Sequence, residues 1–423
     1  MSSPASFRLS ETTPAQRKTL LAAALGWALD SFDVMLYALV LPYIIRDLGL
    51  SKAEGGLPHT FTLVASGIGG VLFGVIADRI GRQKALMLSI LTYSICSLAS
   101  GFAPSLWVLV AVRFVLGLGM GGEWNTGATL VAETWPTHLR AKALSIVQSS
   151  WALGYAAAAV VVWVVLMFAP WRVVFMVGVL PALVTLWIRK DVPESPMWQQ
   201  HRAAHANAPV AGPATLVDPR GSFWDLFSRR FVRSTLALML LNLFGMFGWW
   251  GLFSWLPARF VLPVTEGGLG FSEVEKTVLL VILNLTGMFT GYASFGWVAD
   301  RIGRRKAFFI YTFIAALLVP LYAVANSFWA LLLLGTPVAF FGTGFFSGSG
   351  IVGSELFPTN IRARALGFTY NGARTLSALA PFVIGWVAGQ HGLTGAFFVC
   401  AGSFLLAAFT SLLLPETLGK HLD

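Results

Sequence analysis

A short charged motif occurs twice in this chain, each time between two long apolar runs. The first copy, Gly74–Lys84, reads GVIADRIGRQK, and the second copy, Gly296–Lys306, reads GWVADRIGRRK. At the same offset, an ETWPT run that starts at Glu133 matches an ELFPT run that starts at Glu355. An offset that holds across most of each half indicates two homologous halves of about 200 residues. The sequence therefore predicts a duplicated bundle.

The composition of the chain places this bundle in a membrane. Of the 423 residues, 56% are hydrophobic and 11% are charged, which excludes an ordinary soluble protein. We expect an all-α membrane protein with twelve transmembrane helices in two pseudo-symmetric six-helix bundles. Each expected helix is long enough to cross a hydrocarbon core of about 30 Å. Their ranges are 20–45, 57–77, 85–103, 105–130, 141–168, 171–188, 234–256, 275–299, 307–325, 327–353, 364–388 and 393–414.

These ranges divide the chain into five parts. We expect a cytoplasmic N-terminal segment at 1–19, a first bundle at 20–188, a cytoplasmic linker at 189–233, a second bundle at 234–414 and a cytoplasmic tail at 415–423. The polar start and the long apolar run that follows it argue against a cleavable signal peptide.

The positions of the 29 Lys and Arg residues predict the orientation. If the N-terminus is cytoplasmic, the outer segments hold only Arg46, Lys52, Arg172, Arg259 and Lys276. This positive-inside pattern predicts a multi-pass protein of the plasma (inner) membrane with both termini in the cytoplasm. It also explains the net charge of +10 without a nucleic-acid partner. Neither Cys96 nor Cys400 has metal or redox spacing, and we expect a monomer without a cofactor, coupled to protons.

Several motifs together resemble those of the major facilitator superfamily. They are the doubled GxxxDRxGR loop, an RxxxGxG run that starts at Arg113, and a PET ending at Pro415. Within that superfamily, LGLGMGGEW from Leu116 resembles the metabolite:proton symporters. DSFD from Asp30 and ETWPTHLR from Glu133 are more similar to the sialate and short-carboxylate:proton symporters. Leu418 stands where sugar porters have Lys, which argues against a neutral sugar as substrate.

The resemblance implies that the doubled loops latch the cytoplasmic side while the binding site faces outward. Gly74 would let two helices approach closely, and Gly81 would allow a tight turn. The alternative is that these charges only enforce topology. The predicted latch residues are Gly74, Asp78, Arg79, Gly81, Arg82, Glu133 and Arg140, with Gly296, Asp300, Arg301, Gly303, Arg304, Glu355 and Arg362 in the second half.

Ionisable residues inside the apolar runs break the symmetry of the two halves. A charge at the bilayer centre costs about 2.5–3.5 kcal/mol on insertion scales and usually marks an ion or substrate path. The first half holds every such acid, and the second half holds one such cation, Arg374. We predict that Asp33, paired with Arg113, carries protons, with Asp30 or Glu123 as an inner relay. A static buried ion pair remains the alternative.

The remaining predicted site residues concern the substrate. A guanidinium near the midplane offers a planar fork that fits a carboxylate, so we predict that Arg374 binds the substrate's carboxylate. Neutralisation of Arg374 by carbonyl groups or by a first-half acid is the alternative. Further candidates, each of which could instead be core packing, are Asn371, Tyr370, Gln148, Trp151, Tyr155, Asn242, Trp249 and Asn284.

The function that these residues predict is proton-coupled uptake of a small organic anion, such as a mono- or dicarboxylate or a sialic-acid-like acid, by alternating access. A proton-coupled efflux antiporter for drugs or metabolites is the second possibility, although a cationic drug would be repelled by Arg374. A membrane sensor or receptor is a possibility of another class. An enzyme is not expected, because the sequence shows no nucleotide loop, metal spacing or nucleophile–base pair.

Overall fold

A computed structural model describes residues 12–195, 198–199, 223–358, 361 and 365–418, and these residues form helices and connections without a β-strand. The helices of the first half are α1 (Pro14–Leu48), α2 (Lys52–Ile80), α3 (Arg82–Ser100), α4 (Leu106–Thr134), α5 (Thr137–Leu166), α6 (Trp171–Val177) and α7 (Ala182–Asp191). The last two divide one apolar segment, Trp171–Ile188.

A short 3₁₀ helix, η2 (Phe223–Phe227), precedes the second half. The helices of the second half are α9 (Val232–Val261), α10 (Glu273–Ile282), α11 (Phe289–Ile302), α12 (Arg304–Val324), α13 (Phe328–Leu356), α15 (Ala373–Ser377) and α16 (Ala380–Ser411), with a 3₁₀ turn, η3 (Val264–Glu266). Two π-helical segments, η4 (Leu283–Met288) and η5 (Gly367–Gly372), interrupt them.

Ten helices in the described residues are long and apolar enough to cross a membrane. The tenth runs from Gly367 to Ser411, and Gly392 breaks it with a backbone φ of 71°. Adding α3, which is 19 residues long, and dividing the tenth helix at Gly392 accounts for all twelve predicted segments. The all-helical fold is therefore confirmed, while the number twelve depends on these two assignments.

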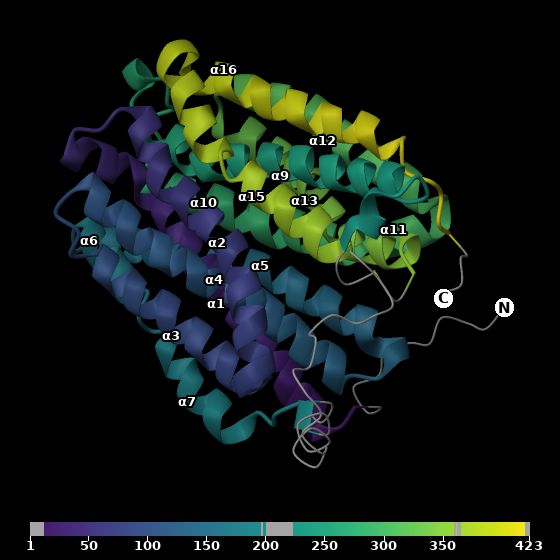
Figure 1. The fold of residues 1–423 in the computed structure, drawn as a ribbon. Coiled ribbons are helices and arrows are strands. Elements are labelled where there is room, and N and C mark those ends of the chain that lie inside the picture. The colour runs from purple at the N-terminus through teal and green to yellow at the C-terminus, as the bar shows by residue number, and fades with distance from the viewer. Residues whose placement is uncertain (1–11, 196–197, 200–222, 359–360, 362–364, 419–423) are drawn as a thin grey trace.

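The two halves lie side by side, the first in purple and blue and the second in green and yellow (Figure 1). Inside each half, glycines bring helices together. A Cβ on Gly121 of α4 would lie 1.9 Å from the Ser66 carbonyl oxygen of α2, and one on Gly291 of α11 would lie 2.5 Å from the Phe340 carbonyl oxygen of α13. Without a hydrophobic force between helices in lipid, such backbone approach supplies much of the packing energy.

Hydrogen bonds between the halves lie away from the doubled loops, on the side that we call the outer side. Tyr43 of α1 donates to Glu273 of α10 over 2.6 Å, and the Lys52 ammonium donates to the Glu266 carbonyl oxygen over 2.8 Å. On the inner side, where the doubled loops lie, the ion pairs of the described residues stay within one half. The structure is therefore closed on the outer side.

Candidate functional site

A cavity lined mostly by aromatic side chains lies between the two halves. In this conformation its volume is about 20 Å³, the space of about one water molecule. The first half contributes residues of α1 and α5, and the second half contributes residues of α9, α11, α13, η5 and α15. The lining residues are Trp27, Gln148, Trp151, Met246, Trp249, Trp250, Tyr292, Phe346, Tyr370 and Arg374.

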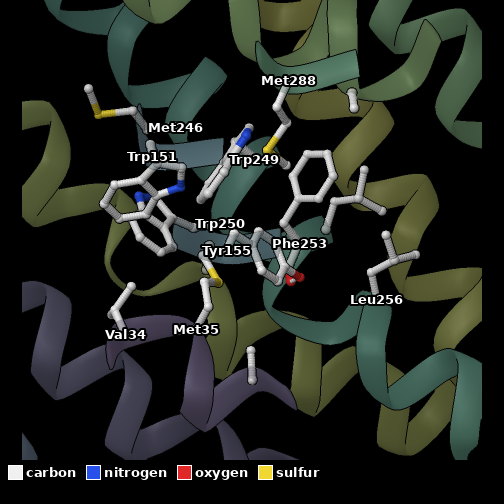
Figure 2. Close-up of a cluster of buried hydrophobic side chains, with 14 of the residues drawn as sticks. Val34, Met35, Trp151, Tyr155, Met246, Trp249, Trp250, Phe253, Leu256 and Met288 are labelled. Carbon is white, nitrogen blue, oxygen red and sulfur yellow. Dashed lines mark hydrogen bonds between the residues drawn. The ribbon is translucent and has the colours of Figure 1, made fainter. Parts of the chain in front are cut away.

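The aromatic rings contact one another across the boundary between the halves. Ring centroids of Trp27 and Trp151 lie 4.8 Å apart, and those of Trp151 and Trp250 lie 5.9 Å apart. Figure 2 shows Trp151, Trp249 and Trp250 gathered in one cluster, with Met246 beside them. Walls of this kind present ring faces and edges, which pack well against a flat unsaturated ligand.

Arg374 is the charged residue of this lining. Its side chain is 5% exposed, and it follows the π-helical segment η5, which also carries Tyr370. Single-turn π segments inside α-helices are frequent at functional sites. In the described part of the chain, no hydrogen bond or ion pair within 4.0 Å occupies the Arg374 guanidinium. Its donors are therefore free to bind an anion in the cavity.

Two buried carboxylates of the first half lie close enough to Arg374 to interact with its charge. Asp30 and Glu123 are each 1% exposed, and both interact electrostatically with Arg374 and with each other. Neither forms an ion pair with the guanidinium. One oxygen of Asp30 and both oxygens of Glu123 lack a hydrogen-bond partner among the described residues. A carboxylate pair without partners at this depth is suited to binding protons.

Asp33 and Arg113 do not form the direct ion pair that the sequence led us to predict. Asp33 instead accepts a 2.7 Å hydrogen bond from Ser97. The Arg113 guanidinium lies over the rings of Tyr37, at 5.1 Å, and Phe175, at 5.5 Å. These ring faces stabilise the cation in place of a carboxylate. The charges of Asp33 and Arg113 still interact, but at a longer range than a salt bridge.

Five of the predicted substrate residues line the cavity in this conformation, namely Arg374, Tyr370, Gln148, Trp151 and Trp249, whereas Asn371, Tyr155, Asn242 and Asn284 do not. Asn242 accepts a 2.6 Å hydrogen bond from Ser349 and so holds α9 against α13. Tyr155 donates to the Phe253 carbonyl oxygen over 3.2 Å, which joins the two halves. Both side chains are thus engaged in packing.

Sequence reasoning missed five lining residues, which are Trp27, Met246, Trp250, Tyr292 and Phe346. One signal was available for Trp27. It precedes Asp30 by three positions, so the two side chains share a face of α1. The other four were hidden among the many apolar residues of their helices.

The doubled loops form matching charge clusters. Arg82 pairs with Asp78 at 2.8 Å and with Glu133 at 3.2 Å. Arg304 pairs with Asp300 and, at 3.1 Å, with Glu355. Each cluster lies within its own half, so it does not latch the halves together while the outer side is closed. Of the other predicted latch residues, the Arg140 side chain and Arg362 lie outside the described residues, and Arg301 lies over the Trp297 ring at 3.5 Å.

The glycines of these loops have different roles. Gly81 and Gly303 have φ values of 101° and 99°, which a residue with a side chain rarely adopts, so the predicted tight turns are present. The prediction for Gly74 is wrong in this conformation, because a Cβ there would meet no atom within 4 Å. Its counterpart Gly296 would meet only the tip of Ile351, at 3.9 Å.

Two further acids, each in the segment that follows the last helix of its half, complete the clusters. Glu194 accepts from the Arg82 backbone N–H, and Glu416 accepts from the Arg304 backbone N–H, both over 2.8 Å. Partial burial opposes ionisation of Glu416, but backbone N–H groups of residues 304, 305, 417 and 418 together lower its pKa. Each acid thus satisfies free N–H groups at a helix N-terminus, where a negative charge is stabilised.

The family profile of the Major Facilitator Superfamily matches residues 23–294 and 259–422 of the chain. The protein belongs to the major facilitator superfamily. It is therefore a multi-pass membrane transporter and not an enzyme, as the sequence led us to expect.

Two relatives within this superfamily support the predicted likeness to carboxylate and sialate transporters. The "Probable 4-methylmuconolactone transporter" of Cupriavidus pinatubonensis is 36% identical over 97% of this chain and 93% of its own length. The "Sialic acid transporter NanX" of Escherichia coli is 31% identical over 96% of this chain and 94% of its own length.

Solved structures support the fold. The xylose transporter XylE from E. coli, in an inward open conformation, superimposes with a TM-score of 0.74 at 22% identity, covering 96% of this chain and 98% of that one. At this level of identity, the likeness of this major facilitator protein to XylE concerns the fold alone.

Proposed function

We propose that this transporter takes up a small, flat organic anion together with protons by alternating access. The observation that carries the proposal is the Arg374 guanidinium, which lines an aromatic cavity, has no hydrogen-bond or ion-pair partner among the described residues, and interacts electrostatically with two buried acids, Asp30 and Glu123. A guanidinium fits a carboxylate, and aromatic walls fit a flat hydrocarbon body.

The choice of a flat acid follows from the lining. Besides Arg374, the cavity offers the amide of Gln148, the hydroxyl groups of Tyr292 and Tyr370, and indole N–H groups, while aromatic ring faces make up much of the remaining lining. A polyhydroxylated sugar acid would meet ring faces over much of its hydroxylated surface, and each hydroxyl group left without a partner would cost about 1–3 kcal/mol. The names of the two relatives offer both classes, a muconolactone and sialic acid. The cavity favours the first.

Coupling arises through the shared charge of Arg374. When a substrate carboxylate binds the guanidinium, Asp30 and Glu123 lose much of its stabilising field, so binding a proton becomes more favourable for them. By thermodynamic reciprocity, protonation of these acids strengthens substrate binding. Asp33 lies next to this pair and interacts with Asp30, so it provides a further proton site.

Charge balance sets the driving force. A monoanion that moves with one proton carries no net charge and responds only to the pH difference. A second proton would add about 2.3 kcal/mol for each 100 mV of membrane potential. With both termini in the cytoplasm, the outer side closed in this structure faces outward, and the substrate leaves toward the doubled loops.

The test is a thermal-shift screen of the purified protein with benzoate, 2-furoate, 4-acetylbenzoate and sialic acid at two pH values. Acids that stabilise the protein are then tested for uptake into proteoliposomes with and without a protonophore. We expect flat acids to bind more tightly at the lower pH, and uptake to stop when the proton gradient collapses.

The deciding variant is Arg374→Lys, which keeps the charge but loses the planar fork. We expect affinity to fall about 10- to 100-fold, because a charge-assisted bond to a carboxylate is worth about 1.5–3 kcal/mol. The matched control is Arg172→Lys, which changes an arginine paired with Asp47 on the outer surface. Unchanged affinity in Arg374→Lys, or uptake that ignores the protonophore, would refute the proposal.

A further inference from the structure

Two buried indole N–H groups of cavity-lining residues have no hydrogen-bond acceptor among the residues that the structure describes. They are Nε1 of Trp27 and Nε1 of Trp151, and both side chains line the cavity. An indole nitrogen can only donate, so no rotation turns it into an acceptor. A buried donor left unpaired costs about 1–3 kcal/mol. These unpaired donors raise the free energy of the site, and a ligand that accepts their hydrogen bonds can remove that cost.

Two buried tryptophans of the second half, Trp249 and Trp255, have acceptors for their N–H groups. Trp249 donates to the Thr343 hydroxyl oxygen over 3.3 Å, and Trp255 donates to the Pro381 carbonyl oxygen over 2.8 Å. Trp249 also lines the cavity, so lining the cavity does not by itself leave an indole without a partner. The two unpaired donors belong to neighbouring rings, because the ring centroids of Trp27 and Trp151 lie 4.8 Å apart.

The two donors and Arg374 come from different halves. Trp27 belongs to α1 and Trp151 to α5, both in the first half, whereas Arg374 belongs to α15 in the second. Arg374 already provides for one carboxylate. A ligand that fills the cavity would therefore contact Arg374 from the second half and these two indoles from the first half.

We propose that Trp27 and Trp151 form a second subsite, which donates hydrogen bonds to an acceptor on the substrate other than the carboxylate held by Arg374. This inference rests on the proposed function. The substrate is then a flat acid that carries, at its far end, a ketone, a lactone or ring oxygen, or a second carboxylate. Groups that only donate, such as an ammonium, find no partner at this subsite.

A ligand with both features contacts both halves. Its carboxylate binds the second half and its acceptor binds the first, so its binding energy favours conformations in which the halves are close together. An acid without the acceptor binds only one side of the cavity. We therefore expect the acceptor to increase the rate of transport as well as the affinity.

The experiment compares two acids of nearly identical shape, 4-acetylbenzoate and 4-isopropenylbenzoate, which differ in a carbonyl oxygen against a methylene group. Affinities are measured by calorimetry on the purified full-length protein. We expect the unaltered protein to bind the ketone about 5- to 10-fold more tightly, since one or two net hydrogen bonds contribute about that much.

The variants Trp27→Phe and Trp151→Phe keep an aromatic ring and remove the N–H group. In either variant the preference for the ketone should fall toward one. The matched control, Trp255→Phe, removes a buried indole outside the cavity lining whose N–H group donates to the Pro381 carbonyl oxygen, so the preference should persist. Thermal unfolding of each variant checks the fold, and either of the two test variants suffices if the other does not fold.

The outcomes separate the two proposals. A preference that survives in the test variants, or that is lost equally in Trp255→Phe, overturns the subsite but leaves uptake of a flat acid intact. Equal binding of both acids by the unaltered protein also overturns the subsite and leaves uptake of a flat acid intact. If neither acid binds the unaltered protein, the proposed flat-acid substrate fails, and the subsite fails with it.

Discussion

The closed outer side depends on a buried ion pair that only the second half supplies. The Lys276 side chain is fully buried, and its ammonium lies 2.5 Å from the carboxylate of Glu273, whose side chain is 22% exposed. The same carboxylate accepts the hydrogen bond from Tyr43 across the boundary between the halves. Lys276 also approaches the Leu39 carbonyl oxygen, at 3.5 Å. We predict that Glu273→Gln opens the outer side.

The size of the effect follows from burial. Removing one partner of a buried pair costs about 3–5 kcal/mol, because the other charge is left uncompensated. Glu273 retains some contact with solvent, and Gln can still accept a hydrogen bond from Tyr43. We therefore expect Glu273→Gln to destabilise the closed outer side by about 2–3 kcal/mol. This changes the ratio of outward-closed to outward-open molecules by about 30- to 150-fold, since water can solvate Lys276 once the halves part.

The assay is the reaction of a single cysteine with an impermeant maleimide added from the outer side. Ala159→Cys serves as the reporter, with Cys96 and Cys400 replaced by Ala, because Ala159 is fully buried where α5 meets Thr277 of α10. Labelling should be much faster in Glu273→Gln than in the parent protein.

The matched control for this assay is Asp47→Asn. Asp47 also forms an outer ion pair, with Arg172, but both residues belong to the first half. This variant should label at the parent rate. Equal labelling of Glu273→Gln and its parent, or acceleration by Asp47→Asn of the same size, would refute the reasoning.

Two further predictions concern close contacts within one half. In Gly178→Ala, the new Cβ would lie 2.0 Å from the Ser97 hydroxyl oxygen and 2.3 Å from an Asp33 oxygen, so uptake should fall. The control, Gly402→Ala, places its Cβ in open space and should keep normal uptake. Normal uptake in Gly178→Ala would contradict a role for this contact. The lowered pKa of Glu416 means that its ionised form stabilises the fold above its usual pKa of 4.5, and that this stability is lost as pH falls through the lowered value. Thermal unfolding of Glu416→Gln against its parent should therefore differ at neutral pH and converge in acid; a difference that persists in acid would show that charge is not the cause.

The fold was predictable because the repeated motif requires the same backbone geometry in both copies. A turn with positive φ needs glycine, and an arginine that follows it needs an acid within reach, so Gly81 with Arg82 and Gly303 with Arg304 implied two matching corners. Glu194 and Glu416 stood at the same offset in the sequence. Their role as acceptors for helix N-termini depends on where the chain returns after six helices, which no local pattern shows.

The charged part of the site was equally accessible from the sequence, because an ionisable residue inside an apolar run is costly and so attracts attention. The aromatic part of the site could not be predicted from the sequence. Sixteen Trp and 33 Phe residues are spread along the chain, and whether one faces lipid, core or cavity depends on helix rotation. Trp107 is 67% exposed, whereas Trp27 is 3% exposed, although both lie in apolar runs.

The partner of each buried charge also lay beyond the sequence. Asp33 and Arg113 have opposite charges, yet Ser97 contacts the one and two ring faces contact the other. Gly178 is the reason that Ser97 can come so close to Asp33, and it lies in the break between α6 and α7. The Ser97 hydroxyl, the absence of a side chain at Gly178 and the break between α6 and α7 act together here. None of these three features alone indicates a contact with Asp33 in the sequence.

The asymmetry of the two halves explains how such a molecule can couple its ligands. If both halves carried acids and cations, each half could satisfy its own charges, and an empty cavity would be as stable as a filled one. Here the first half holds Asp30 and Glu123, and the compensating cation, Arg374, belongs to the second half without contacting them directly. In the proposed mechanism, a substrate anion neutralises Arg374 and protons neutralise Asp30 and Glu123, so the fully loaded cavity leaves none of these three charges uncompensated. The loaded state is then the one in which the halves can exchange their open and closed sides at the lowest cost.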